Sequence, residues 1–92
     1  MKTDYKLIEN REAKRFELHV EGSIAFIDYT IKQDKIYLTH VEVPNALEGR
    51  GIGSALVKLT LEDLEDSNLK VVPDCPFVVS YIDNNPKWEP LM

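Results

Sequence analysis

The first half of the chain alternates apolar and polar residues with a period of two, which is typical of β-strands that bury one face. In RFELHV, for example, Phe16, Leu18 and Val20 fall on one face and Glu17 and His19 on the other. Short polar turns separate such runs, and β-branched and aromatic residues are frequent within them. The pattern predicts an antiparallel meander of four strands, over residues 4–9, 15–20, 23–32 and 35–43.

The period changes after Pro44, a residue that cannot donate to a sheet ladder. From residue 51 to residue 66 apolar residues recur at helical spacing, which predicts a helix with a broad apolar face. A short apolar run, residues 69–72, predicts a buried fifth strand. A second helix is predicted over residues 75–85, with Pro76 in its first turn. The expected order is therefore β-β-β-β-α-β-α, an α+β fold with helices packed on a largely antiparallel sheet.

Length and charge limit the classes of protein to consider. The 92 residues fit one domain, residues 1–92, with a modest core. Eleven basic and sixteen acidic residues give a net charge of −5, which argues against a nucleic-acid partner, because binding to phosphates requires a basic surface. The same charge is compatible with a cationic substrate such as an amine.

Features that the sequence lacks indicate where the protein works. No apolar run approaches the roughly 18 residues that span a bilayer, so we expect no membrane partner. The polar N-terminus does not resemble a secretory leader, and a single cysteine excludes an internal disulfide. Two distant histidines and one cysteine are poor spacing for a metal site. We therefore expect a cytoplasmic protein that uses no metal.

Three of the four glycines lie in the sequence GRGIG, at Gly49, Gly51 and Gly53, directly before the first predicted helix. The first amides of a helix have no acceptor within the helix, and glycines allow an anion to approach the backbone. Arg50 adds positive charge at this end, and Lys58 lies eight residues further on, near the same face. We therefore predict an anion site here, while a simple tight turn before a solvated helix is the alternative.

The charges at the other end of this predicted helix are acidic, which opposes the helix dipole and strengthens the contrast between its two ends. The acidic residues are Glu62, Asp63, Glu65 and Asp66. Neither common nucleotide motif is present, because no Gly-Lys-Ser/Thr occurs and the glycines alternate instead of following GxGxxG. A phosphate-bearing ligand other than a nucleotide substrate is thus favoured.

The segment VPNALEGRGIGSALV, residues 43–57, resembles the acetyl-CoA-binding segment of the GCN5-related N-acetyltransferases (GNAT superfamily). That segment has Gln or Arg, two residues, Gly, one residue, and then Gly or Ala. With THVEVP, KVVPDCPFVVSYI and NNPKW, the chain is similar to the very small single-domain branch of the family, the YjdJ-like or NATD1-like acetyltransferases. The resemblance covers about residues 16–88 and implies a minimal GNAT-like fold that transfers an acetyl group from acetyl-CoA to an amine.

The resemblance also implies which residues contact the coenzyme. Backbone amides from Gly49 to Ser54 would hold the pyrophosphate, and the acetyl group would lie between the fourth and fifth strands. Glu48 departs from the Gln or Arg of the family pattern, which predicts weaker binding because an acid lies beside a pyrophosphate. The expected coenzyme-binding residues are Val41, Val43, Glu48, Gly49, Arg50, Gly51, Ile52, Gly53, Ser54 and Lys58.

Acetyl transfer to an amine requires removal of an amine proton and protonation of the departing thiolate. His40, which the alternation places on the same face as Ile36 and Leu38, is the candidate base, because histidine titrates near neutral pH. Its alternative role is a structural hydrogen bond. Cys75, at the start of the second helix, either accepts the acetyl group or lines the pocket. The resemblance assigns protonation of the thiolate to Tyr81, which otherwise only packs.

Two functions stay open on the sequence alone. The main prediction is an N-acetyltransferase, and the alternative is a non-catalytic module that binds CoA or acetyl-CoA as a sensor or interaction domain. The short chain and Glu48 favour the alternative. We expect His19 and Trp88 to be structural. Because no loop long enough to specify an acceptor is evident, the sequence predicts neither the acceptor amine nor the oligomeric state.

Overall fold

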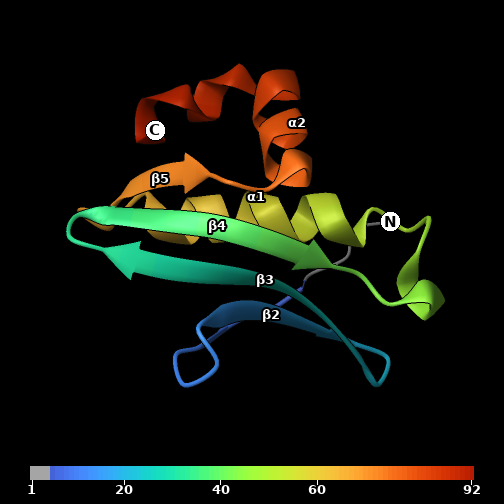
Figure 1. Ribbon diagram of the computed structural model, residues 1–92. Coiled ribbons are helices and arrows are strands. Elements are labelled where there is room, and N and C mark those ends of the chain that lie inside the picture. The colour runs from blue at the N-terminus through green and yellow to red at the C-terminus, as the bar shows by residue number, and fades with distance from the viewer. Residues whose placement is uncertain (1–4) are drawn as a thin grey trace.

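Antiparallel hairpins form most of the sheet in the computed structural model, which describes residues 5–92 (Figure 1). The predicted meander is confirmed, and its strands pair in chain order as β1 (Leu7–Asn10), β2 (Arg15–Val20), β3 (Ser23–Lys32) and β4 (Lys35–Glu42). The second and third strands have the predicted bounds. The predicted first strand includes Asp4, which lies outside the described residues.

The second half of the chain supplies the helices and an edge strand. These elements are the 3₁₀ turn η1 (Asn45–Leu47), helix α1 (Ile52–Leu64), strand β5 (Lys70–Pro73), helix α2 (Pro76–Asn84) and the 3₁₀ segment η2 (Pro86–Leu91). Because α1 carries the chain back along the sheet, β5 lies parallel to β4 at the sheet edge. The element order and the α+β class are as predicted, although both helices are one or two residues shorter at each end.

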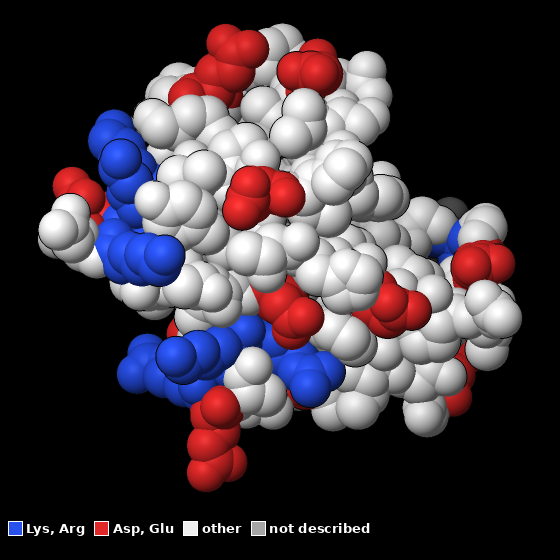
Figure 2. Space-filling model, viewed as in Figure 1, with Lys and Arg blue, Asp and Glu red and all other residues white. Residues whose placement is uncertain are grey.

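One face of the sheet packs against α1 and forms the core, where Phe16, Leu18 and Val20 are buried as the alternation predicts. Ile31 shares their face but is 48% exposed, since it lies near the end of β3. Trp88 is buried, which holds the C-terminal segment against the body. The opposite face of β2–β4 carries no helix among the described residues (Figure 1), and acidic and basic side chains are interspersed on it (Figure 2).

A β-bulge in β4 reverses the direction of the side chains that follow it. Asp28 pairs with His40, whereas the next residue, Tyr29, pairs with Leu38, so Thr39 is the extra residue. Leu38 precedes the bulge and is fully buried, while His40 follows it and is exposed on the uncovered face. The prediction that His40 faces the same way as Leu38 is therefore wrong, because one extra residue shifts the period-two alternation.

Strand β4 extends further than its parallel neighbour. The last paired residues are Leu38 and Pro73, and β4 continues to Glu42 along an edge that β5 does not reach. The chain leaves β5 after Asp74, whose N–H donates to the Leu38 carbonyl at 3.0 Å, and turns into α2. The fourth and fifth strands thus diverge at residues 39–42, beside the glycine-rich turn.

Candidate functional site

The turn before α1 requires glycine at two positions. Gly49 and Gly51 have φ angles of +78° and +72°, in the left-handed region where a side chain is strained. A Cβ built on either residue would meet no atom within 4 Å and would project into open space. The strain is therefore conformational, and the space above the turn is free for a ligand.

The amides at the start of α1 have no hydrogen-bond acceptor among the described residues. Gly51 is the N-cap residue and makes no side-chain hydrogen bond, and the first intrahelical bond runs from the Ala55 N–H to the Gly51 carbonyl at 3.0 Å. Within residues 5–92, the N–H groups of Ile52, Gly53 and Ser54 therefore precede the hydrogen-bonded part of the helix. Together with the helix dipole they favour an anion.

Gly53 has a different role from the other two glycines. A Cβ on Gly53 would lie 2.8 Å from Cζ of Phe77, a distance that real Cβ atoms do not show. The absence of a side chain lets the Phe77 ring of α2 pack on the first turn of α1. Phe77 nevertheless stays 42% exposed. Phe77 is not among the site residues that the sequence predicts. A signal was nevertheless present, because Phe77 lies off the helix face that Val78 and Ile82 bury and is therefore an apolar residue without a place in the core.

A hollow of about 250 Å³ lies over this turn, and we call it the glycine-turn pocket. Its lining is Val43, Leu47, Glu48, Gly49, Gly51, Ile52, Gly53, Ser54 and Phe77. Seven of the ten predicted coenzyme-binding residues are in this lining. Val41, Arg50 and Lys58 lie outside it. The pocket therefore brings the end of β4, the turn, the first turn of α1 and α2 together.

Arg50 points toward another part of the molecule. Its Nη1 and Nη2 donate to the two carboxylate oxygens of Glu21 at 2.9 and 2.8 Å, across to the β2–β3 turn. The pair holds the pKa of Glu21 below its usual range, chiefly through the hydrogen bonds from Arg50. Arg50 would have to leave this carboxylate to reach an anion at the glycine turn, so its contribution there competes with an existing ion pair.

A second hollow of about 420 Å³ continues from the glycine-turn pocket between α1 and α2. The two share Ser54 and Phe77, and Tyr81, Asn84 and Asn85 extend the lining. Burial raises the pKa of the Tyr81 hydroxyl, a nearby Trp88 indole lowers it in part, and the charge of Glu62 raises it further. The Tyr81 phenol therefore stays protonated near neutral pH and remains a proton donor.

His40 and Cys75 lie outside these two hollows. The His40 Nε2 lies 2.9 Å from a carboxylate oxygen of Glu42, and both side chains are more than half exposed on the uncovered face. Cys75 is the N-cap residue of α2 and 7% exposed, in a shallow hollow of about 370 Å³ with Asp74 and Ser80 in its lining. The structure thus gathers Tyr81, but neither His40 nor Cys75, with the glycine turn.

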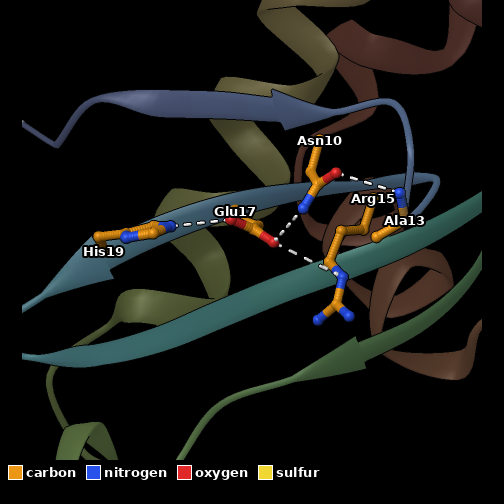
Figure 3. A network of polar contacts seen from close by, with 5 residues as sticks. All are labelled: Asn10, Ala13, Arg15, Glu17 and His19. Carbon is orange, nitrogen blue, oxygen red and sulfur yellow. Dashed lines mark hydrogen bonds and ion pairs between the residues drawn. The ribbon is translucent and has the colours of Figure 1, made fainter.

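A polar network on the uncovered face surrounds the second histidine (Figure 3). His19 Nε2 lies 2.8 Å from a carboxylate oxygen of Glu17, and Asn10 donates from Nδ2 to the other oxygen at 3.2 Å. Arg15 Nε lies 3.6 Å from that same oxygen. These contacts hold the pKa of Glu17 below its usual range, with the His19 contact the largest cause and burial opposing it. The expected structural role of His19 agrees with this network.

Across residues 5–92, no group of three or more His, Cys, Asp or Glu side chains is arranged to hold a metal ion. The helices of this part are too short and too polar to cross a membrane.

A family model described as GCN5-related N-acetyl-transferase matches residues 15–91. The chain belongs to this family. Protein NATD1 of Mus musculus is 30% identical over 81 residues, which cover 84% of this chain and 73% of that protein. Protein NATD1 of Xenopus tropicalis is 28% identical over the same shares of the two chains. These relatives support the expected likeness to the small NATD1-like branch.

A solved structure shows the same fold. The solution structure of a GCN5-like putative N-acetyltransferase from Staphylococcus aureus superposes with a TM-score of 0.72 at 21% identity, over 94% of this chain and 85% of that chain. The match agrees with the five-stranded mixed sheet and its packed helices. The predicted minimal fold of a GCN5-related N-acetyltransferase is therefore confirmed.

The glycine turn fits the coenzyme that GCN5-related N-acetyltransferases typically use. The pyrophosphate of acetyl-CoA needs free amide donors and room for its oxygens, and the turn offers uncapped N–H groups below a space that a Cβ would enter. The Glu48 carboxylate belongs to the same lining and opposes such an anion. The backbone geometry of the turn thus favours binding of the pyrophosphate, whereas the negative charge of Glu48 disfavours it.

Proposed function

We propose that this protein is a cytoplasmic N-acetyltransferase that transfers the acetyl group of acetyl-CoA to an amine, without a nucleic-acid or membrane partner. The observation that carries the proposal is the turn at Gly49 and Gly51, whose left-handed backbone leaves amides uncapped and the space above them open. The membership in a family of acetyltransferases supports the same reaction class.

In this proposal the first turn of α1 binds the coenzyme through its backbone. The N–H groups of Ile52, Gly53 and Ser54 would donate to the pyrophosphate, and the exposed face of Phe77 would pack on the apolar arm. Lys58 lies one turn beyond Ser54, in reach of a further phosphate. The acetyl thioester, which supplies the group to be transferred, would then lie near residues 39–42, where β5 no longer pairs with β4.

Two side chains would move protons. The Tyr81 hydroxyl, which burial keeps protonated, would donate its proton to the departing sulfur. His40 would accept a proton from the acceptor amine at the imidazole nitrogen, with the Glu42 carboxylate orienting the ring. Because His40 lies on the uncovered face, the acceptor would approach from the side opposite α1. Cys75 would either take the acetyl group or form part of the pocket wall.

Calorimetric titration with acetyl-CoA tests the turn. Gly51→Glu places a carboxylate in the ligand space and is expected to weaken binding by at least about tenfold, whereas Glu48→Gln removes a repulsive charge and strengthens it several-fold. Gly22→Glu is the matched control, because Gly22 also has a left-handed φ of +81° and open space at its Cβ but lies in the β2–β3 turn. Equal affinity of wild type and Gly51→Glu would refute the assignment.

A non-catalytic module that binds acetyl-CoA is the second candidate function. It is favoured by the separation of His40 and Cys75 from the hollows that contain Tyr81 and the glycine turn. Release of free CoA in the presence of a panel of amines and peptides separates the two functions. Steady release that is lost in His40→Ala and in Tyr81→Phe supports the enzyme, and tight binding without release supports the module.

A further inference from the structure

A larger hollow, of about 520 Å³, lies at the other end of α1, and we call it the distal pocket. It lies between the β1–β2 turn, the far end of the β3–β4 hairpin and the last turn of α1. Helix α1 has 13 residues, so at about 1.5 Å per residue the distal pocket is roughly 20 Å from the glycine turn. Its volume falls within the roughly 300–1,000 Å³ typical of small-molecule sites.

The floor of the distal pocket is apolar. Phe16, Ile36 and Leu64 belong to the buried core and form part of its lining. Ile31, one of the few large apolar side chains with about half of its surface exposed, stands at the rim, and the half-buried Leu69 lies in the same lining. A ligand that covers Ile31 and Leu69 would remove their exposed apolar surface from water.

The two walls of the distal pocket carry opposite charges. The β1–β2 turn supplies Arg11 and Lys14, while Asp63 stands on the last turn of α1. The helix dipole adds partial negative charge at that end, where the carbonyls of Leu61, Glu62 and Leu64 accept hydrogen bonds from Glu65 and Ser67. No basic residue lies in the last turn to balance this charge. The acidic end of α1, which the coenzyme site does not use, therefore forms one wall of this pocket.

The remaining charge in the lining is neutralised by its neighbours. Tyr29 donates from its hydroxyl to Glu9 Oε2 at 2.9 Å, and Arg11 Nε lies 3.4 Å from the same oxygen. Burial, with the Glu9 contact, raises the pKa of Tyr29 to about 12, so its phenol stays neutral. The side chain of Arg11 is 85% exposed, and only its Nε takes part in the ion pair with Glu9. Because Arg11 and Glu9 offset each other, Lys14 carries the net positive charge of one wall, while Asp63 carries the negative charge of the other, above an apolar floor.

We propose that the distal pocket binds a small zwitterion with an apolar body, a free apolar amino acid or dipeptide. Its ammonium group would lie toward Asp63 and the end of α1, its carboxylate toward Arg11 and Lys14, and its side chains on the floor. A ligand with one charge would leave the opposite wall without a partner. The site is separate from the proposed coenzyme site, and its test does not depend on acetyl transfer.

Titration of the protein with L-leucyl-L-leucine, followed by amide chemical shifts in NMR, tests the proposal. We expect shifts at residues 11–16 and 63–69, and none at residues 49–54. N-acetyl-leucyl-leucine lacks the ammonium group, and leucyl-leucine amide lacks the carboxylate. Each is therefore expected to bind more weakly than leucyl-leucine, by a factor of up to about five. Equal shifts with all three peptides, or none at millimolar peptide, would overturn the proposal.

Charge variants assign each end of the ligand to a wall. Asp63→Asn is expected to remove the preference for the free amino group over the acetylated one, and Lys14→Gln to reduce the preference for the free carboxylate over the amide. Glu12→Gln and Lys6→Gln make the same charge changes on exposed residues outside the lining and should leave both preferences intact. If the controls and the pocket variants weaken binding alike, the charged walls do not recognise the ligand.

Discussion

Two histidine–glutamate pairs lie on the uncovered face of the sheet, and they differ in burial rather than in spacing. In each pair the two residues are two positions apart in the sequence. The distance from the histidine Nε2 to the glutamate Oε1 is 2.8 Å for His19 and Glu17 and 2.9 Å for His40 and Glu42. The strand register places the two glutamates on either side of Phe26. Yet the side chain of Glu17 is 10% exposed, and that of Glu42 is 53% exposed.

The difference follows from the neighbours of each carboxylate. Glu17 lies on an inner strand, where Asn10 of β1 donates to its carboxylate (Figure 3). On the same face, the Arg15 guanidinium lies 4.2 Å from the centre of the Phe26 ring. Among residues 5–92, the bond with His40 is the only side-chain hydrogen bond of Glu42. The same two-residue motif is thus a structural link in β2 and an accessible pair in β4.

The largest expected effect concerns catalysis by the accessible pair. If His40 accepts the amine proton, His40→Gln lowers kcat/KM for acetyl transfer by roughly 10²–10⁴-fold, as removal of a general base does. His19→Gln, the matched change in the β2 pair, where only the glutamate is buried, should alter kcat/KM less than about twofold. Release of CoA at saturating acetyl-CoA measures both. Similar activity in the two variants would show that neither histidine takes the proton.

For the stability of the fold, the pair in β2 should matter more than the pair in β4. Glu17→Ala leaves Asn10 and His19 without their shared hydrogen-bond partner and Arg15 without its ion-pair partner, and it is expected to lower the free energy of unfolding by about 2–3 kcal/mol. Glu42→Ala removes an exposed contact and should cost less than about 0.5 kcal/mol. Urea unfolding followed by circular dichroism measures both values. An equal loss in the two variants would contradict the assignment of separate roles.

A smaller effect is expected from Glu42 on the reaction. Glu42→Gln keeps a hydrogen-bond acceptor near His40 but removes the charge, so kcat should fall by about tenfold or less while the KM for acetyl-CoA stays the same. Glu17→Gln is the control in the β2 pair. It should leave kcat unchanged at a temperature where this variant is folded. A rise in KM for acetyl-CoA in Glu42→Gln would instead place this residue in the coenzyme site.

The smallest expected effect is on the pH dependence of stability. The pKa of Glu17 is lowered from 4.5 in the folded protein, mainly by His19, so its carboxylate stabilises the fold above pH 4.5. This stabilisation is lost as the pH falls through the lowered pKa. The difference in unfolding free energy between wild type and Glu17→Gln should therefore shrink as the pH falls from neutral to strongly acidic. A difference that does not change with pH would refute the role of this carboxylate.

The regular parts of the fold could be predicted because they depend on local periodicity. The alternation in residues 15–20 and 23–32 defined two strands to the residue, and the glycines before α1 indicated the turn. The direction of His40 could not be predicted, since nothing distinguishes Thr39 as an extra residue in a strand. The bulge depends on how β3 and β4 pair, which is not local information.

The parts of the candidate site that come from distant segments also escaped prediction. Phe77 reaches the glycine-turn pocket only because Gly53 lets two helices approach, and the Glu21 partner of Arg50 lies 29 residues away in sequence. The distal pocket combines a hairpin turn with the end of a helix, whose acidic residues looked like a solvated surface. Such juxtapositions require the folded chain, whereas the backbone requirement for glycine is visible in the sequence.

The extra residue at Thr39 decides which residues of β4 face which side of the sheet. If Thr39 took a regular position in the strand instead of bulging, the residues after it would shift by half a period, turning His40 toward α1 and Val41 toward the open face. No amino acid would have changed, yet the imidazole would have left the face on which we propose that the acceptor binds. A change in strand pairing alone can therefore relocate a functional group as completely as a substitution.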